Sequence, residues 1–362
     1  MEVAVVGAGI VGLSAAHALR ERGATVRVYE RGRPGGGQSA GESRLFRHAH
    51  ADPRQVEMAK RSRAIWREWE ESFGTELVSS DGVVALGDSA LELLDGLDRI
   101  GGVDARRIDA GELGELLPPL AGYDGPAVLD ADGGSIRTTA AIAALADPLG
   151  EALVTEEVLS LRPQGERVTL RSGTGRATFD RVVVCAGRGT APLANTVGLS
   201  LPIELAAHLR LTFELSGPPP QRLACLQDSS GEFPETGVYA APEPGNRRYA
   251  VGLSETLEVA SDGGIIDPAA LDSLSERTIG YVREALPGLD PEPAEFVHGW
   301  VTAAPWSEDG LGIWRQEGVL FAAGHNLFKM APELGRELAS AALGDEVAEA
   351  LRPEARLGQP PG

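Results

Sequence analysis

Three glycines and one acid near the start of the chain have the spacing of a dinucleotide-binding turn. Gly7 lets the chain turn tightly off a strand, Gly9 lets the backbone approach a pyrophosphate, and Gly12 lets a helix pack closely on a sheet. Glu30 lies eighteen residues beyond Gly12, where a carboxylate accepts a hydrogen bond from a ribose hydroxyl. An acid at this place favours FAD or NAD over NADP. The alternative is an ordinary βαβ unit with a glycine turn.

The segments around this motif have the patterns of a strand, a helix and a second strand. Residues 3–6 are apolar, and residues 26–30 form a second strand-like run that ends at Glu30. Between them, Leu13, Ala16 and Leu19 give a helix with one apolar stripe. Free amides and the positive dipole at the start of that helix suit a phosphate. The N-terminal segment is therefore predicted to be a βαβ dinucleotide-binding unit.

The rest of the chain alternates helix patterns with short strand patterns, which predicts an α/β fold with a Rossmann-type cofactor domain. A second, mainly antiparallel β domain is predicted from the strand-rich segments at 205–215, 237–241 and 248–253. We assign residues 1–83, 135–202 and 307–362 to the first domain, and residues 84–134 and 203–306 to the second. Helices are expected at about 53–73, 139–149, 267–286 and 332–343, a broken helix at 91–117, strands at 82–87, 158–161, 168–170, 181–184 and 319–324, and a frayed tail after Arg352.

Composition narrows the classes of partner. The 362 residues exceed the size of one typical core, 43% are hydrophobic and 24% charged, and the formal net charge is −20. This acidity disfavours nucleic acid and anionic membranes as partners. Cys185 and Cys225 have no metal-ligand spacing and are expected to be reduced core residues. With a strand beginning at Val3 and no long apolar run, we expect no signal peptide, no membrane span and a cytoplasmic protein.

A nonapeptide after the second strand carries two arginines, and it is the most specific part of a family resemblance. From Val3 to about Leu343, the chain resembles the D-amino-acid oxidase superfamily of FAD enzymes, especially the monomeric sarcosine oxidase (N-methyl-amino-acid oxidase) and glycine oxidase branch. The matching pieces are Gly41-Glu42-Ser43-Arg44-Leu45-Phe46-Arg47-His48-Ala49, Val183-Val184-Cys185-Ala186-Gly187, Gly237-Val238-Tyr239, and Ala322-Ala323-Gly324 with Phe328-Lys329.

The resemblance implies roles for four side chains. Arg47 and Lys329 match the residues that hold the substrate carboxylate, and two converging cations suit one anion. Arg44 matches an arginine beside the flavin ring, and Tyr239 matches a tyrosine that lines the substrate pocket. The helix that carries Pro332 would point its N-terminus toward the flavin.

The resemblance also implies where the cofactor lies. FAD would be bound by Gly7, Gly9, Ile10, Val11, Gly12, Glu30, Arg31, Ser39, Arg44, Val158, Ala186, Gly187, Gly324, His325, Leu327 and Lys329. No metal is expected. His48 and His50 are expected to form structural hydrogen bonds. His208, His298 and His325 are scattered along the sequence, and of these only His325 is expected near the flavin.

Three departures from the family pattern change the expectations. Thr302 stands where the sarcosine oxidase branch has the cysteine that bonds to the flavin, so FAD should be noncovalent. Ala250 stands where that branch has a lysine thought to activate oxygen. Ser39 and Ala40 replace a His-rich approach to the arginines, and His50 replaces a tyrosine, so the pocket is not a copy of the sarcosine site.

The expected function is oxidation of a glycine-like or N-substituted amino acid. The C–N bond would become an imine that hydrolyses, with O2 reduced to H2O2. A small amine carrying a carboxylate is the expected substrate, and the candidates include a larger N-carboxymethyl intermediate of a biosynthetic pathway. The alternatives are an FAD-dependent dehydrogenase that passes electrons to a carrier, a flavoprotein subunit with a silent site, and, as a third, an NAD protein.

Overall fold

A six-stranded sheet is built around the N-terminal βαβ unit. The computed structural model describes residues 1–260 and 262–360, and within them this sheet has the order β19-β20-β12-β1-β2-β8. Neighbouring strands are parallel except for β19, which is antiparallel to β20. The dinucleotide turn thus lies at the end of a central, buried strand. The strands are β1 (Glu2–Val6), β2 (Thr25–Glu30), β8 (Leu153–Thr155), β12 (Arg181–Val184), β19 (Leu311–Gln316) and β20 (Val319–Gly324).

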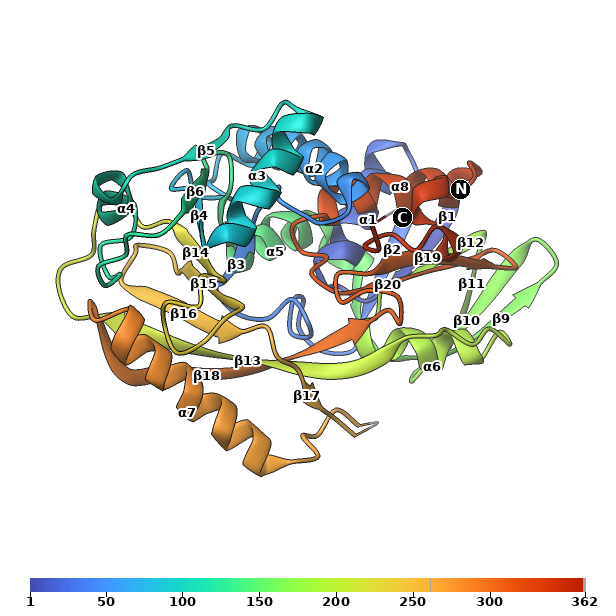
Figure 1. Cartoon of the computed structure of the whole chain (residues 1–362). Coiled ribbons are helices and arrows are strands. Elements are labelled where there is room, and N and C mark those ends of the chain that lie inside the picture. The colour runs from blue at the N-terminus through green and yellow to red at the C-terminus, as the bar shows by residue number, and fades with distance from the viewer. Residues whose placement is uncertain (261, 361–362) are drawn as a thin grey trace.

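Helices from both ends of the chain cover this sheet (Figure 1). Helix α1 (Ile10–Glu21) packs on α8 (Ala331–Leu343) so closely that a Cβ at Gly335 would lie 2.6 Å from the Cβ of Ser14. Helix α2 (Pro53–Phe73), begun by Asp52 as its N-cap, and α5 (Thr138–Ala146) complete the same hydrophobic core. One face of the sheet is therefore covered by helices drawn from three separate segments.

A nine-stranded sheet forms the other half of the molecule. Its order is β17-β13-β16-β15-β14-β4-β6-β5, and β18 pairs with β13 along most of its length. Helix α7 (Pro268–Ala285) packs on β13 and β18 along the lower edge of Figure 1. The strands are β4 (Val83–Leu86), β5 (Ala105–Arg107), β6 (Ala127–Asp130), β13 (Glu204–Leu215), β14 (Cys225–Asp228), β15 (Val238–Pro242), β16 (Arg248–Leu253), β17 (Leu257–Glu258) and β18 (Leu289–Ala303).

The remaining elements are smaller. The arginine nonapeptide forms β3 (Ser43–Phe46), which is antiparallel to β7 (Gly134–Arg137). The segment expected as a broken helix is α3 (Asp88–Ile100) and α4 (Ala110–Leu116) with strand β5 between them. The remaining elements are β9 (Val158–Gln164), β10 (Arg167–Ser172), β11 (Arg176–Phe179), α6 (Thr190–Asn195), and the short 3₁₀ turns η1 (Asp147–Ala152), η2 (Gly187–Gly189), η3 (Glu349–Leu351) and η4 (Pro353–Ala355).

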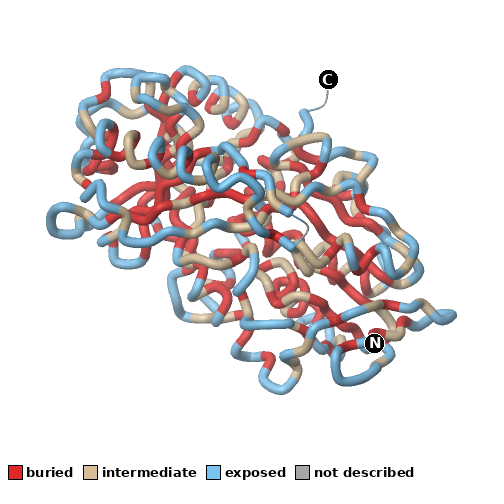
Figure 2. Tube along the Cα trace, turned by 90° about the horizontal axis from the view of Figure 1, so that it is seen from below, coloured by how far each residue is buried: buried red, intermediate tan, exposed pale blue. Residues whose placement is uncertain are grey.

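The expected fold class is confirmed, since an α/β sheet with the dinucleotide turn lies beside a mainly antiparallel sheet. The strands of the six-stranded sheet all come from 1–83, 135–202 and 307–362. The division into two domains at those boundaries stays a prediction. Figure 2 shows buried strands running through both halves, with exposed loops around them.

Two further expectations concern the tail and membranes. A frayed tail after Arg352 is wrong for the residues up to 360, because Gly358 donates a 2.9 Å hydrogen bond to buried Asp52 and Arg54 donates to Ala355. Residues 361 and 362 lie outside the described part. Among the described residues, none of the helices is both long and apolar enough to cross a membrane.

Candidate active site

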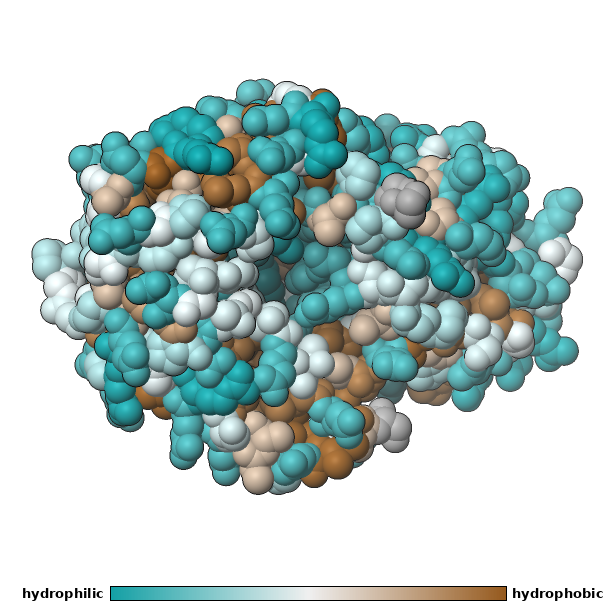
Figure 3. Space-filling view, viewed as in Figure 1, coloured by the Kyte–Doolittle hydropathy of each residue, from teal (hydrophilic) through white to brown (hydrophobic). Residues whose placement is uncertain are grey.

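A cavity of about 1190 Å³ lies between the two sheets and is lined by residues from both. A pocket for one small molecule typically measures about 300–1,000 Å³, so this cavity has room for a larger ligand or for two. Figure 3 shows a hollow near the centre of one face, bordered by mostly hydrophilic side chains. The predicted substrate residues and all but one of the predicted cofactor residues line this same cavity.

The three glycines of the turn have the geometry that their spacing predicts. Gly7 has φ +99°, and a Cβ there would lie 2.4 Å from the carbonyl oxygen of Cys185. A Cβ at Gly12 would lie 2.0 Å from the Gly7 carbonyl, so only glycine allows α1 to pack this closely. A Cβ at Gly9 would meet only Ser39 Oγ, at 3.2 Å. Gly9 therefore leaves open space in front of the helix.

Two polar side chains frame that space. Glu30 accepts hydrogen bonds from the amides of Ala8 (2.8 Å) and Gly32 (2.9 Å), which hold its carboxylate at the edge of the cavity. Ser39 Oγ accepts from the amide of Ile10 at 3.0 Å, at the start of α1. A phosphate at this helix N-terminus would lie beside the Ser39 hydroxyl.

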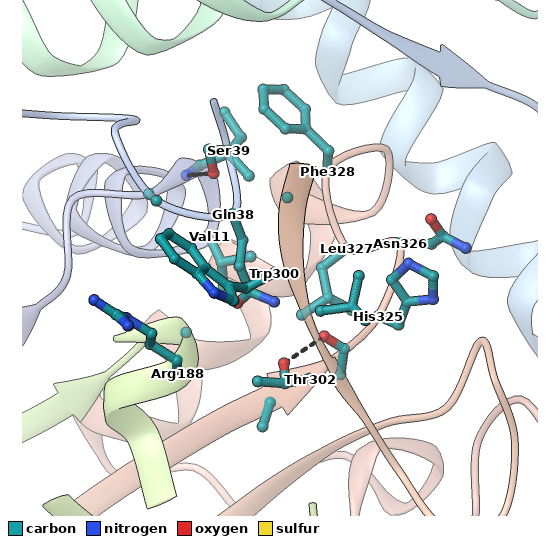
Figure 4. Close-up of a pocket in the computed structure, with 18 of the residues that line it drawn as sticks. Val11, Gln38, Ser39, Arg188, Trp300, Thr302, His325, Asn326, Leu327 and Phe328 are labelled. Atoms are coloured by element: carbon teal, nitrogen blue, oxygen red, sulfur yellow. Dashed lines mark hydrogen bonds between the residues drawn. The ribbon is translucent and has the colours of Figure 1, made fainter. Parts of the chain in front are cut away.

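A neighbouring part of the cavity wall fits a polar ligand as well. Arg188 and Trp300 both line the cavity, and the guanidinium carbon of Arg188 lies 4.4 Å from the centre of the Trp300 ring (Figure 4). Arg188 Nε is buried with no hydrogen-bond partner in the structure. A buried unsatisfied donor suits a ligand oxygen. Together with the glycine turn on the adjacent strand, these residues fit FAD.

All the predicted FAD residues except Gly12 line the cavity, and Gly12 acts through helix packing instead. Their contacts with FAD stay a prediction. Thr302 also lines the cavity, and its Oγ1 donates a 2.9 Å hydrogen bond to the carbonyl of Gly324 (Figure 4). Ala250, on the neighbouring sheet, lines it too.

A second buried arginine accompanies Arg44. Arg44 and Arg210 each donate a 2.8 Å hydrogen bond to the carbonyl of Ser43. Burial, and then the charge of Arg210, lowers the pKa of Arg44, and burial lowers the pKa of Arg210. Burial raises the pKa of nearby Tyr239. Arg210 was not among the predicted site residues, and its position on one face of a predicted strand was the available signal.

The two predicted carboxylate-binding cations lie beside an acid that the sequence analysis also missed. Arg47 Nη2 lies 3.4 Å from Asp309 Oδ2. Burial alone would raise the pKa of Asp309, but His50, Lys329 and Arg47 hold it well below its usual range. Burial lowers the pKa of Lys329 to about 8, with Asp309 opposing and Arg47 adding to the shift. The structure thus brings Arg47, Lys329 and Asp309 together at the cavity wall.

The histidines differ partly from expectation. His48 is structural as predicted, with Nδ1 3.0 Å from the Asp130 carboxylate. His50 is buried and forms no hydrogen bond, although its Nδ1 lies 3.5 Å from the Asp309 carboxylate, and burial lowers its pKa to about 3. The expectation that only His325 is near the cofactor site is wrong, because His208 stacks on His325 with ring centroids 4.9 Å apart and both line the cavity.

Comparison with known proteins gives the family. A model of the family "FAD dependent oxidoreductase" (DAO) matches residues 2–341. Glycine oxidase of Geobacillus kaustophilus is 26% identical over 97% of this chain and 95% of its own length. Monomeric sarcosine oxidase of Streptomyces avermitilis is 30% identical over 56% of each chain.

Solved structures agree in fold. NikD, described as an unusual amino acid oxidase essential for nikkomycin biosynthesis, has a TM-score of 0.82 at 22% identity, with 99% of this chain and 97% of NikD covered. The crystal structure of the Geobacillus kaustophilus glycine oxidase has a TM-score of 0.75 at 24% identity, with 97% and 96% covered. With the family model matching almost the whole length, this chain belongs to the DAO family of FAD-dependent oxidoreductases.

Proposed function

We propose that the protein oxidises a glycine-like or N-substituted amino acid, with noncovalent FAD as cofactor and O2 as electron acceptor. One observation carries the proposal: Arg47 and Lys329 lie together on the wall of the same cavity that holds the dinucleotide turn. Glycine oxidase and sarcosine oxidases among the relatives support this class of substrate.

The cationic end of the cavity would bind the substrate carboxylate. Arg47 and Lys329 carry two positive charges and Asp309 one negative charge, so the group has a net charge of +1 that matches a carboxylate. Charge-assisted hydrogen bonds from a guanidinium and an ammonium orient such an anion strongly. Held this way, the substrate presents its α-carbon and amine to the rest of the cavity.

FAD, when bound, would supply the two-electron oxidation of the C–N bond. The protein residues contribute positioning and electrostatics. The buried cations Arg44 and Arg210 place positive charge at the cavity wall. The overall reaction takes an amine, water and O2 to a carbonyl compound, the released amine and H2O2. Oxidation of a neutral amine needs no side-chain base, and the proposal assigns none.

Thr302 supports noncovalent attachment, because a hydroxyl does not readily form the thioether that a cysteine would supply. Its Oγ1 is also engaged by the carbonyl of Gly324. Acid precipitation of the holoenzyme tests this point: the yellow colour should remain in the supernatant. A yellow pellet would contradict it.

Ala250 supports a second candidate, an FAD-dependent dehydrogenase. Ala250 is only 6% exposed and lines the cavity without a charge. Oxygen uptake during turnover distinguishes the two: uptake equal to the amine oxidised indicates an oxidase, whereas turnover only with an added electron carrier indicates a dehydrogenase. A silent flavoprotein subunit remains the other alternative, and the presence of both Arg47 and Lys329 argues against it.

A further inference from the structure

Three hydrogen-bond acceptors meet in the cavity next to the predicted carboxylate site. His208 comes from β13, His325 follows β20, and Glu308 lies in the loop before β19. A nitrogen of each imidazole and a carboxylate oxygen of Glu308 all lie within 4.8 Å of one another. We call these three residues the acceptor trio. None of them has a part in the proposed binding of the carboxylate.

The backbone determines which imidazole nitrogens are free to accept a hydrogen bond. His208 Nδ1 lies 3.1 Å from the carbonyl of Glu255, and His325 Nδ1 lies 3.2 Å from the carbonyl of Glu308. A carbonyl can only accept, so each Nδ1 carries the proton and each Nε2 is left as an acceptor. Burial lowers the pKa of both rings, that of His325 to about 4, so both are neutral at pH 7. The trio therefore offers acceptors and no donor.

The spacing of the trio suits an ammonium group. An ammonium nitrogen that donates three hydrogen bonds of about 2.8 Å in tetrahedral directions needs acceptors about 4.6 Å apart. A zinc ion bound at about 2.0–2.1 Å needs its ligand atoms only about 3.4 Å apart. One nitrogen of each imidazole and a Glu308 oxygen lie within 4.8 Å of one another, which leaves room for an ammonium, and Zn²⁺ is the competing ligand that the experiment must exclude.

Charge balance indicates that this ammonium is not the reacting amine. The group formed by Arg47, Lys329 and Asp309 has a net charge of +1 and is matched by the substrate carboxylate. The amine that is oxidised must be neutral to give up electrons, so it cannot balance Glu308. Burial, and then Asp309, raises the pKa of Glu308 against the opposing effect of Arg47, and a further cation nearby would favour its charged form. The chain's net charge of −20 also favours the approach of cationic molecules.

We propose that His208, His325 and Glu308 bind a second, protonated amino group of the substrate, so that the preferred substrates are diamino carboxylic acids. This inference rests on the proposed function, because it takes the carboxylate to lie at Arg47 and Lys329. It goes further by naming the group that the remainder of the cavity recognises.

The experiment compares diamino acids with uncharged partners of the same shape. The FAD-loaded protein is titrated without oxygen with ornithine against norleucine, and with 2,4-diaminobutyrate against norvaline, in both enantiomers. Binding is followed by the change in flavin absorbance, whether or not the colour is lost. Because a hydrogen bond to a charged group contributes about 1.5–3 kcal/mol, at least one diamino acid should bind about 10- to 150-fold more tightly than its partner.

Variants assign that preference to the trio. Glu308→Gln and His325→Gln should reduce the ratio of the two dissociation constants to about one, whereas Glu151→Gln, an equal change of charge at an exposed residue outside the cavity, should keep it. The wild-type ratio decides the proposal even if a variant fails to fold.

Equal binding of each pair, or binding of neither member, would overturn the proposal. So would Zn²⁺ binding that is lost in His325→Gln while no diamino acid is preferred, since the trio would then be a metal site. If uncharged amino acids bleach the flavin without any preference for a second amino group, the proposed function stands and this inference fails. If no amine bleaches the flavin, the proposed function fails while the binding ratio still answers the question.

Discussion

The carboxylate of Asp309 lies 3.4 Å from the guanidinium of Arg47, so the predicted carboxylate-binding arginine already has an acid beside it. Asp309 also raises the pKa of Lys329, against the larger effect of burial. The acid therefore reduces the charge of the cationic end from +2 to +1 and helps to keep Lys329 protonated. A substrate with one carboxylate suits that remaining charge.

Replacing Arg47 should weaken turnover of the true substrate. Arg47→Ala removes charge-assisted hydrogen bonds worth about 1.5–3 kcal/mol, which corresponds to a loss of about 10- to 150-fold in kcat/KM. Steady-state kinetics with the FAD-loaded variant measures the effect. Arg99→Ala, at an exposed residue of α3 outside the cavity, is the matched control and should leave kcat/KM unchanged. Unchanged turnover in Arg47→Ala would remove this residue from the site.

Carboxylate binding should weaken as the pH rises through about 8. The carboxylate is ionised throughout this range, whereas Lys329, whose pKa burial lowers to about 8, loses its charge. Acetate, which carries no amine to titrate, is the suitable probe, and its dissociation constant should be lowest below pH 8 and increase above it. In Lys329→Met the increase of the acetate dissociation constant above pH 8 should disappear. Lys60→Met, at a surface ion pair with Glu57, should retain this increase. A flat profile in the wild type would contradict the assignment.

Asp309→Asn should lower the pH at which the acetate dissociation constant begins to increase. The substitution removes the negative charge that raises the pKa of Lys329, so burial and Arg47 act unopposed. At pH 6, where Lys329 is still charged, acetate should bind more tightly than to the wild type, because it no longer competes with the Asp309 carboxylate. The acetate titration read at several pH values checks both effects. If the acetate dissociation constant increases at the same pH as in the wild type, or at a higher pH, Asp309 does not raise the pKa of Lys329.

Gly9 and Gly12 should respond differently to alanine. Gly12→Ala places a methyl group 2.0 Å from the Gly7 carbonyl, so unfolding free energy should fall by about 1–3 kcal/mol or more even without cofactor. Gly9→Ala meets only Ser39 Oγ at 3.2 Å, and its φ of −75° is open to any residue. This variant should fold normally and lose FAD affinity by about tenfold or more, because its methyl group narrows the phosphate space. Thermal unfolding of the apoprotein and FAD titration separate the two effects; equal stability losses would contradict the account.

Ala250→Lys should speed the reaction with oxygen. A positive charge at this cavity wall would stabilise the negative charge that develops on O2. The rate of the reaction with oxygen should therefore increase by about tenfold or more. Ala250→Met adds a chain of similar length without the charge and should not change the rate. Stopped-flow mixing of the reduced protein with oxygenated buffer measures both. Equal rates in the two variants would indicate that charge at this position does not govern the oxygen reaction.

Local patterns were sufficient to predict the dinucleotide turn and the strands around it. The conformational demands of Gly7 and Gly12 act between neighbouring elements of the chain, so they are visible in the spacing of the residues. Apolar and polar residues alternate along β13, and this alternation indicates that one face of the strand is polar. Leu209 and Leu211 belong to the hydrophobic core, while His208 and Arg210 line the cavity from the other face of the strand.

Asp309 could not be predicted in the same way. It follows Glu308 in an irregular loop and contacts Arg47, which is 262 positions away in the sequence. No local periodicity relates two such residues, because only the packing of the two sheets brings their loops together. The meeting of His208 with His325 has the same origin, since one lies on the nine-stranded sheet and the other follows a strand of the six-stranded sheet.

The most direct test of the proposed function is to mix the purified FAD-loaded protein, without oxygen, with glycine, N-substituted glycines and diamino acids, and then to admit air. The flavin absorbance near about 450 nm should be lost with at least one of these amines, and it should return with release of H2O2 when air enters. A protein that binds FAD but is bleached by none of them would contradict the proposed amino-acid oxidase activity.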